Sequence, residues 1–318
     1  MPTLLISYNL PEPSMQSLAE HFTLIHPTET QSFSREEILK HVVSVDAYLA
    51  VNTKVDRDII DRAEKLKIIA NYGAGYDDID TKYAASRGIP VTNTPRAVTE
   101  ATAEIAFGLM LSLLRNITFC DRQLRGNAEF EWGMLKAHTG RSLYGKTLGI
   151  IGLGRIGKAV ARRAIVSGMK VIYHQRHALF AGIEKEVSAE YRALDDLLEQ
   201  ADIVSLHVPL TSDTRHLIGE PQLRRMKPSS YLINTARGPV VDQDALIHYL
   251  QEGKLAGAGL DVFAEEPHVP AELLAMDRVI VTPHIGTETI EARIAMATEA
   301  QNNLMAFFNG DRPPNVVN

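Results

Sequence analysis

The stretch Thr147-Leu-Gly-Ile-Ile-Gly152-Leu-Gly154-Arg155-Ile156-Gly157 decides the fold of this chain. It begins as an apolar run typical of a buried strand and continues into a helical pattern, with glycines at G-x-G-x-x-G spacing between the two. The first glycine permits a tight turn, the second lets the backbone approach a phosphate, and the third lets the helix pack on the strand. Because a helix begins with unpaired N–H groups, the turn predicts a dinucleotide site that includes Gly152, Gly154, Arg155, Ile156 and Gly157. A simple strand-to-helix turn is the alternative interpretation.

The next predicted strand, residues 170–174, indicates which dinucleotide binds. It is followed by Gln175 and Arg176, and no acidic residue occurs between residues 168 and 182. An Asp or Glu at this point would accept a hydrogen bond from the ribose 2′-hydroxyl of NAD, whereas a guanidinium can pair with a 2′-phosphate. Gln175 and Arg176 therefore favour NADPH, with NADH still possible. The alternative is that Arg176 is only a solvated surface charge.

Short apolar runs alternate with helical patterns along the chain, which is typical of parallel α/β sheets. Strands are expected at residues 3–7, 47–51, 67–71, 89–92, 147–151, 170–174, 203–207, 231–234, 257–261 and 279–282. A largely apolar helix is expected from Thr99 to about Ile117, and a final helix from about Thr289 to Asn309 that crosses back to the first domain. The sequence thus predicts a Rossmann-type doubly wound parallel sheet inserted into a second, flavodoxin-like α/β domain. Residues 99–286 would bind the dinucleotide, and residues 1–98 plus 287–318 would bind the substrate.

Composition and charge narrow the class of protein. The 318 residues are 45% hydrophobic and carry a formal net charge of −6, which argues against nucleic acid or an anionic membrane surface as the main partner. Cys120 is the single cysteine and has no metal-binding companions, so we expect a reducing compartment and no metal. The first residues do not resemble a signal peptide, and the apolar run Ile105–Leu114 is too short to cross a bilayer. These features predict a cytoplasmic protein.

Three of the later predicted strands each lead to ionisable residues. Arg237 follows one strand, Asp261 and Glu266 follow the next, and His284 follows the last. In parallel α/β sheets ligands bind outside the carboxyl ends of the strands, so we expect these side chains to converge there. Each has an ordinary alternative: a solvated arginine, a structural turn histidine, and Glu265 in the place of Glu266.

Several stretches resemble the D-isomer-specific 2-hydroxyacid dehydrogenase family, and the likeness covers nearly the whole chain. They are Asn71-Tyr-Gly-Ala-Gly-Tyr-Asp77, Thr99-Glu-Ala-Thr-Ala-Glu104, the glycine turn, Thr235-Ala-Arg-Gly238, Asp261-Val-Phe with Glu266-Pro267, and Pro283-His-Ile-Gly286. Within the family the chain is most similar to glyoxylate and hydroxypyruvate reductases, whose second strand also ends with a basic residue and without an acid. The resemblance implies an oxidoreductase, a homodimer and closure of two domains around the substrate.

The chemistry of keto reduction fits the three ionisable groups. His284 would protonate the keto oxygen, and Glu266 would orient the imidazole and favour its protonated form. Arg237 would bind the substrate carboxylate and polarise the carbonyl. By resemblance, the backbone N–H groups of Ala74 and Gly75 complete the carboxylate site from the other domain, and Asp261 contacts the nicotinamide carboxamide. The further cofactor contacts that the resemblance implies are Thr102, Val208, Pro209, Thr214, Thr235, Ala236 and Gly286.

We therefore expect the reduction of a small anionic 2-oxo acid, glyoxylate or hydroxypyruvate, to its D-2-hydroxy acid by NADPH. Glu266 argues against the related formate dehydrogenases, which carry a glutamine there. Larger 2-oxo acids such as phenylpyruvates are close alternatives. NAD-dependent oxidation of a hydroxy acid such as phosphoglycerate and a non-enzymatic, nucleotide-sensing co-repressor are further ones. Trp132 either borders the substrate pocket, of its own or of a neighbouring subunit, or anchors the irregular arm between residues 126 and 145.

Overall fold

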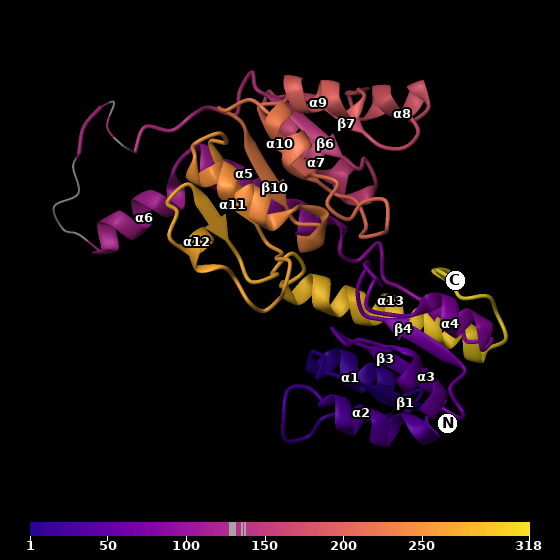
Figure 1. Ribbon diagram of the computed structural model, residues 1–318. Helices are drawn as coiled ribbons and strands as arrows, with labels where there is room; N and C mark the ends of the chain where they lie inside the picture. Colours follow the sequence, from indigo (N-terminus) through magenta and orange to yellow (C-terminus); the bar gives the residue numbers. More distant parts are fainter. Residues whose placement is uncertain (127–131, 135, 137) are drawn as a thin grey trace. The chain divides into compact units, whose positions relative to one another are not determined.

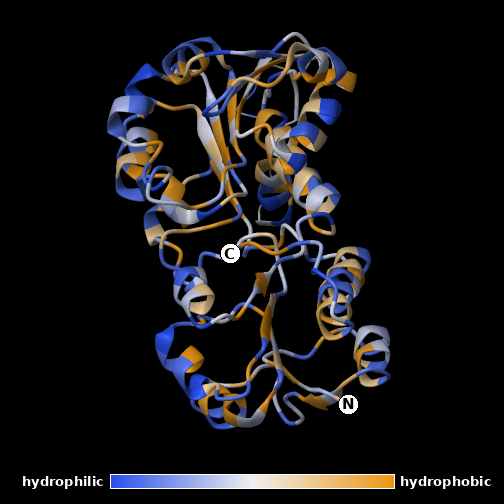
Figure 2. Cartoon of the chain, turned by 90° about the vertical axis from the view of Figure 1, so that its right-hand side faces the viewer, coloured by the Kyte–Doolittle hydropathy of each residue, from blue (hydrophilic) through white to orange (hydrophobic). Residues whose placement is uncertain are grey.

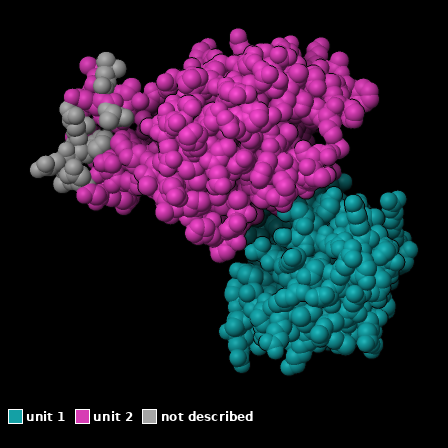
Figure 3. Space-filling model, in the orientation of Figure 1, with its two compact units in different colours: residues 1–98, 287–318 teal, residues 99–286 magenta. Residues whose placement is uncertain are grey.

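The computed structural model describes residues 1–126, 132–134, 136 and 138–318, which form two compact units (Figure 3). Unit 1 comprises Met1–Val98 and Thr287–Asn318, and unit 2 comprises Thr99–Gly286. In both units the strands are mostly hydrophobic, and the helices turn hydrophilic faces outward (Figure 2). Each unit therefore has a buried sheet between layers of amphipathic helices (Figure 1).

Unit 1 is built on a parallel sheet with the order β2-β1-β3-β4-β5 in the described part of the chain. Its strands are β1 (Thr3–Ile6), β2 (Thr23–Ile25), β3 (Ala47–Ala50), β4 (Ile68–Asn71) and β5 (Val91–Thr92). Its helices are α1 (Glu12–Ala19), α2 (Arg35–His41), the 3₁₀ turn η1 (Val42–Ser44), α3 (Arg57–Arg62), α4 (Thr81–Ser86) and α13 (Ile290–Phe308). This strand order is that of flavodoxin, as predicted.

The last helix, α13, belongs to unit 1 although it follows unit 2 in the chain. Thr289 caps it by accepting a hydrogen bond from the Ala292 N–H at 3.0 Å. The helix packs on α1 and β4 and buries Met296 and Leu304. The core of unit 1 thus joins two segments that lie far apart in the sequence.

Unit 2 contains a longer parallel sheet, with the order β12-β11-β10-β9-β6-β7-β8 among the described residues. Its strands are β6 (Thr147–Ile151), β7 (Lys170–His174), β8 (Ala189–Tyr191), β9 (Ile203–Leu206), β10 (Tyr231–Asn234), β11 (Gly257–Leu260) and β12 (Val279–Val281). Its helices are α5 (Thr99–Leu114), α6 (Ile117–Gly126), α7 (Arg155–Val166), α8 (Ala181–Glu186), α9 (Leu194–Gln200), α10 (Glu220–Arg225), η2 (Gly238–Val240), α11 (Gln243–Gln251) and α12 (Ala271–Leu274). The strand order reverses direction between β6 and β9, which confirms the predicted doubly wound fold.

One predicted helix is wrong in its extent. The structure ends α5 at Leu114 and begins α6 at Ile117, where a single helix was expected to end. Asn116 lies between them with a φ of +54°, a left-handed conformation that interrupts a helix and that Asn adopts more readily than most residues. No single described helix is long and apolar enough to cross a membrane, and α5 with α6 qualifies only as a pair bent by 64°.

The predicted irregular arm between residues 126 and 145 is described only in part. Residues 127–131, 135 and 137 lie outside the described residues. Trp132 is 80% exposed, so its side chain neither anchors the arm to the described core nor lines a buried pocket of this chain.

Candidate active site

The glycine turn between β6 and α7 has a different structural reason for each glycine. Gly152 has a φ of +94°, and a Cβ on it would lie 2.5 Å from the carbonyl oxygen of His207. A Cβ on Gly157 would lie 2.3 Å from the carbonyl oxygen of Gly152. A Cβ on Gly154, at the first turn of α7, would meet no protein atom within 4 Å outside its immediate neighbours. Protein packing thus requires the first and third glycines, whereas no described protein atom requires the second, the glycine predicted to let a phosphate approach.

The loop after β9 lies against this glycine turn. The Cγ1 atom of Val208 would be 2.9 Å from a Cβ on Gly152. Thr214 shapes the loop, because its hydroxyl donates to the carbonyl oxygen of Pro209 at 2.6 Å and accepts from the Thr211 N–H at 2.8 Å. Val208, Pro209 and Thr214 are therefore placed beside the predicted dinucleotide site.

Gln175 and Arg176, which are expected to determine the coenzyme preference, directly follow β7. The Gln175 amide donates to the carbonyl oxygen of His177 at 2.8 Å, which folds the loop back on itself. Arg176 is exposed. The nearby Tyr173 hydroxyl accepts from the Leu179 N–H at 2.7 Å and donates to Glu184 at 2.7 Å, so the loop has an anchor at its far end.

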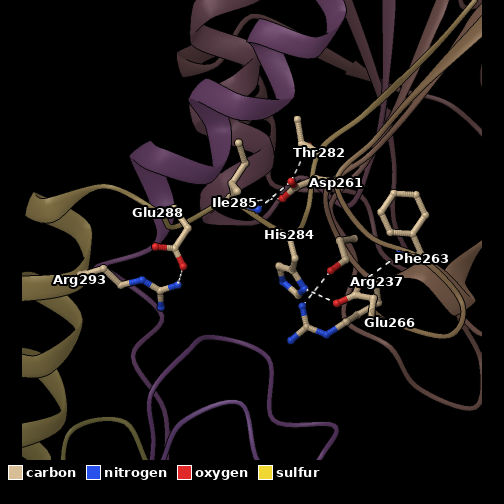
Figure 4. Close-up of polar contacts among 11 residues, drawn as sticks. Arg237, Asp261, Phe263, Glu266, Thr282, His284, Ile285, Glu288 and Arg293 are labelled. Carbon is tan, nitrogen blue, oxygen red and sulfur yellow. Dashed lines mark hydrogen bonds and ion pairs between the residues drawn. The ribbon is translucent and has the colours of Figure 1, made fainter. Parts of the chain in front are cut away.

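The three predicted catalytic side chains come together at the carboxyl ends of β10, β11 and β12, which are neighbours in the sheet (Figure 4). His284 Nδ1 lies 2.7 Å from Glu266 Oε2. Arg237 extends from the loop after β10 toward this pair, and its Nη1 donates to the carbonyl oxygen of Ala236 at 2.9 Å. The side chains of Glu266 and His284 are 34% and 45% exposed, so solutes can reach the pair.

The charge state of Glu266 follows from its neighbours. Burial raises the pKa of Glu266, but the hydrogen bond and charge of His284, the N–H of Phe263 and the charge of Arg237 together lower it below its ordinary value. Glu266 is therefore ionised at neutral pH. Since it accepts a hydrogen bond from Nδ1, the other ring nitrogen, Nε2, is the one left to exchange a proton with a ligand.

Asp261 holds the loop that carries His284, a role that the sequence analysis did not predict. Its carboxylate accepts from the Thr282 hydroxyl at 2.6 Å and from the N–H groups of Ile285 and Gly286 at 2.8 and 2.9 Å (Figure 4). The His284 N–H donates to the Asp261 carbonyl oxygen at 2.9 Å. Burial raises the pKa of Asp261 despite these donors. The loop is thereby held with His284 at a φ of +54°.

Thr102 and Gly286 pack beside Asp261. A Cβ on Gly286 would lie 3.1 Å from Asp261 Oδ2 and 3.6 Å from the Thr102 hydroxyl. The Thr235 hydroxyl is buried and has no hydrogen-bond partner among the described residues. A buried hydroxyl without a partner is uncommon in proteins and is consistent with a group that binds a ligand.

Gly238 allows the loop of Arg237 to reach the loop of Glu266. A Cβ on Gly238 would lie 1.9 Å from the carbonyl carbon and oxygen of Phe263, so any side chain would force these loops apart. Asn234 braces the same turn, because its Nδ2 donates to the Arg237 carbonyl oxygen at 3.0 Å and its Oδ1 accepts from the Ala236 N–H at 3.1 Å.

Ala74 and Gly75 lie in unit 1, on the loop that follows β4. Two asparagines that the sequence analysis did not single out hold this loop. The Asn71 amide donates to the carbonyl oxygens of Gly73 at 3.0 Å and Gly75 at 2.8 Å, and the Asn93 amide donates to that of Ala74 at 2.8 Å. Asn71 opens one of the stretches that carry the family resemblance, although no role was predicted for it, and the only signal of Asn93 is its position directly after β5.

Comparison with known proteins identifies the family. Residues 107–286 match the family described as D-isomer specific 2-hydroxyacid dehydrogenase, NAD binding domain. The chain belongs to this family. A glyoxylate reductase of Thermococcus litoralis is 46% identical over 322 residues, which cover 100% of this chain and 97% of the relative.

Solved structures of the family have the same fold. A glyoxylate reductase from Paecilomyes thermophila is similar with a TM-score of 0.89 and 36% identity, covering 100% of this chain and 99% of that one. An NADPH-dependent glyoxylate/hydroxypyruvate reductase from Sinorhizobium meliloti, in complex with NADP and malonate, is similar with a TM-score of 0.87 and 32% identity. That likeness covers 99% of this chain and 96% of the Sinorhizobium chain.

Proposed function

We propose that this family member reduces glyoxylate or hydroxypyruvate to the 2-hydroxy acid, of D configuration where the product is chiral, with NADPH as the reductant. The observation that carries the proposal is the 2.7 Å contact between His284 Nδ1 and Glu266, with Arg237 beside it at the same edge of the sheet. An acid–base pair next to a guanidinium suits an anionic substrate that gains a proton. The glyoxylate reductases at about 44–46% identity support the choice of substrate.

The residues of unit 2 fit a dinucleotide. The first turn of α7 offers N–H groups to a pyrophosphate, and Gly154 leaves space for its close approach. The orphan hydroxyl of Thr235 offers a further polar group. When bound, the dihydronicotinamide supplies a hydride to the keto carbon of the substrate.

Side chains of unit 2 bind the substrate carboxylate, stabilise the charge that develops on the keto oxygen and supply its proton. Arg237 binds the substrate carboxylate and polarises the carbonyl, where negative charge grows. His284 donates the proton on Nε2 to the keto oxygen, which becomes the hydroxyl group. The ionised Glu266 keeps the ring oriented through Nδ1 and stabilises the imidazolium before the transfer. Asp261 fixes the loop so that His284 keeps this position.

Further parts of the proposal rest on the family resemblance. The N–H groups of Ala74 and Gly75 in unit 1 bind the substrate carboxylate, and Asp261 contacts the nicotinamide carboxamide. The resemblance also supports a homodimer, whereas the proposed cytoplasmic location rests on the single cysteine, which fits a reducing compartment. Size-exclusion chromatography with light scattering measures the oligomeric state, and a monomer at micromolar concentration would contradict that part.

A panel of 2-oxo acids assayed with NADPH and with NADH tests the activity. Fast oxidation of NADPH by glyoxylate or hydroxypyruvate is the expected result. Activity only in the direction of NAD⁺ reduction by a hydroxy acid would replace the proposal with a catabolic dehydrogenase. Coenzyme binding without any turnover would indicate a nucleotide sensor.

The coenzyme preference has its own test, Arg176→Ala. Loss of a guanidinium that pairs with the 2′-phosphate should raise the KM for NADPH by about 10-fold or more, since hydrogen bonds to charged groups contribute about 1.5–3 kcal/mol. The KM for NADH should stay the same. Arg224→Ala, which removes an exposed arginine on α10, is the matched control. Equal changes in the KM values for NADPH and NADH would show that Arg176 does not bind the 2′-phosphate.

A further inference from the structure

The Gly73–Gly75 loop of unit 1 has all three of its carbonyl oxygens bonded inside the protein. The Gly73 oxygen accepts from the Asn71 amide at 3.0 Å and from the Thr94 N–H at 2.9 Å. The Ala74 oxygen accepts from the Asn93 amide, and the Gly75 oxygen accepts from the Asn71 amide. The N–H groups of Ala74 and Gly75, in contrast, have no hydrogen-bond partner among the described residues.

The planarity of the peptide bond links these two observations. In a trans peptide the carbonyl of one residue and the N–H of the next are rigidly joined and point in opposite directions. The peptide bonds of this loop are trans. The bond from Asn93 to the Ala74 oxygen therefore fixes the direction of the Gly75 N–H, and the bonds to the Gly73 oxygen fix that of the Ala74 N–H.

We infer that Asn93 is a positioning residue for substrate binding, because it orients the Gly75 N–H that receives the substrate carboxylate. The inference rests on the proposed function for its ligand, a small 2-oxo acid. Asn93 acts only through the backbone of the loop. Its amide is the only donor to the Ala74 oxygen among the described residues, so nothing else in the described chain holds that peptide group.

Asn93 is itself held by its backbone, which makes the inference testable. The residue is 8% exposed; its N–H donates to the Asn315 oxygen at 3.2 Å, and its carbonyl oxygen accepts from the buried Asn303 amide at 3.0 Å. Both bonds use main-chain atoms of Asn93, so a substitution keeps them. What a substitution removes is the amide contact with the Ala74 oxygen.

The experiment compares Asn93→Ala and Asn93→Leu with the wild type. Leucine keeps the four heavy atoms and the branching of the asparagine side chain, although its methyl groups are larger, and it lacks the donor; a packing role would spare it better than alanine, whereas a donor role would spare neither. Both variants should raise the KM for glyoxylate by about tenfold with little change in kcat, as expected for a ground-state contact with a charged group. The dissociation constant of oxamate, a non-reacting carboxylate analogue, should rise by the same factor, and that of NADPH should not.

Asn318→Ala is the matched control. The Asn318 amide also donates to backbone carbonyls of unit 1, those of Ile89 at 3.0 Å and Thr81 at 3.1 Å, on the amino side of β5. Its substitution should leave the KM unchanged. A normal KM in Asn93→Leu, or an equal rise in Asn318→Ala, would overturn the inference.

A measurement on the wild-type protein covers the case in which the variants do not fold. Oxamate added to the NADPH-loaded enzyme should slow amide hydrogen exchange at Ala74 and Gly75, and unchanged exchange with oxamate bound would overturn the inference. Lack of turnover with every 2-oxo acid, alongside oxamate binding and slowed exchange, would contradict the proposed function and not the role of Asn93.

Discussion

Two loops beyond strand ends are held in place by different chemistry in the two units. In unit 2, charged groups do the holding: Glu266 bonds His284, and Asp261 bonds the loop on which His284 lies. In unit 1, the neutral amides of Asn71 and Asn93 hold the Gly73–Gly75 loop through its carbonyl oxygens. The difference fits the proposed function, in which His284 changes its charge during the reaction while the N–H groups of the loop act as fixed dipoles. Substitution of His284 or of the charged groups that hold it should therefore lower kcat, and substitution of the two asparagines should raise the KM for the 2-oxo acid.

The largest effect should come from His284→Ala, which removes the proton donor. We expect kcat to fall by about 10²–10⁴-fold, the usual contribution of a positioned acid, while the affinity for NADPH stays the same. Steady-state kinetics and coenzyme titration measure the two quantities. His248→Ala is the matched control, because His248 on α11 also faces a carboxylate, Glu252, at 3.2 Å. Near-normal turnover in His284→Ala would show that His284 is not the proton donor.

A smaller effect should come from Asn71→Ala, and its size tests which asparagine controls the direction of the loop N–H groups. The Gly73 oxygen keeps the N–H of Thr94 when the Asn71 amide is removed, whereas the Ala74 oxygen has no such second donor among the described residues. The Ala74 N–H should therefore stay in place, and the KM for the 2-oxo acid should rise by about twofold to fivefold, less than in Asn93→Ala. Both KM ratios should be constant across the neutral pH range, since amides do not titrate. A larger rise in KM for Asn71→Ala than for Asn93→Ala would show that these carbonyl contacts do not fix the directions of the N–H groups.

The last effect, which is absent at neutral pH, concerns the stability of unit 2 in acid. His207 follows β9 and is half-buried, with its Nε2 2.8 Å from the Ser205 hydroxyl and its Nδ1 inaccessible and without a hydrogen-bond partner among the described residues. Burial lowers the pKa of His207 from 6.5 to about 4. The unfolded chain therefore binds a proton in this pH window that the folded chain does not.

The free energy of unfolding should accordingly lose a contribution of about 2–3 kcal/mol as the pH falls from about 6.5 to about 4, and be level above that window. His207→Gln should remove this part of the acid sensitivity, measured by denaturant unfolding at several pH values. His248→Gln, on the surface of α11, should retain it. If the free energy of unfolding falls equally with pH in the wild type and in His207→Gln, another group causes the acid sensitivity.

The sequence predicts much of the sheet and less of its margins. The bounds of β6, β7 and β10 are those expected, because each apolar run of these central strands stops where the chain leaves the core. The edge strands β2 and β8 were not predicted, since each has only three residues and is partly exposed. The break between α5 and α6 was also missed, because a left-handed Asn116 cannot be told from a helical one by its apolar neighbours.

The site divides in the same way. Arg237, Glu266 and His284 could be found because parallel strands bring residues that follow their carboxyl ends to one edge. The second role of Asp261 and the roles of Asn71 and Asn93 could not, because they depend on contacts between segments whose spacing the sequence does not reveal. Asn93, for example, bonds an oxygen 19 residues earlier in the chain. An asparagine beside a strand is otherwise typical of an ordinary turn.

The position of α13 in the chain has a consequence for synthesis. Residues 287–318 complete the core of unit 1, yet the ribosome makes them after all of unit 2. The usual order, in which the amino-terminal domain folds first as it emerges, is therefore not open to this chain. Unit 2 can become native while unit 1 still lacks the helix that covers β4, so nascent chains should resist proteolysis in unit 2 before they do so in unit 1.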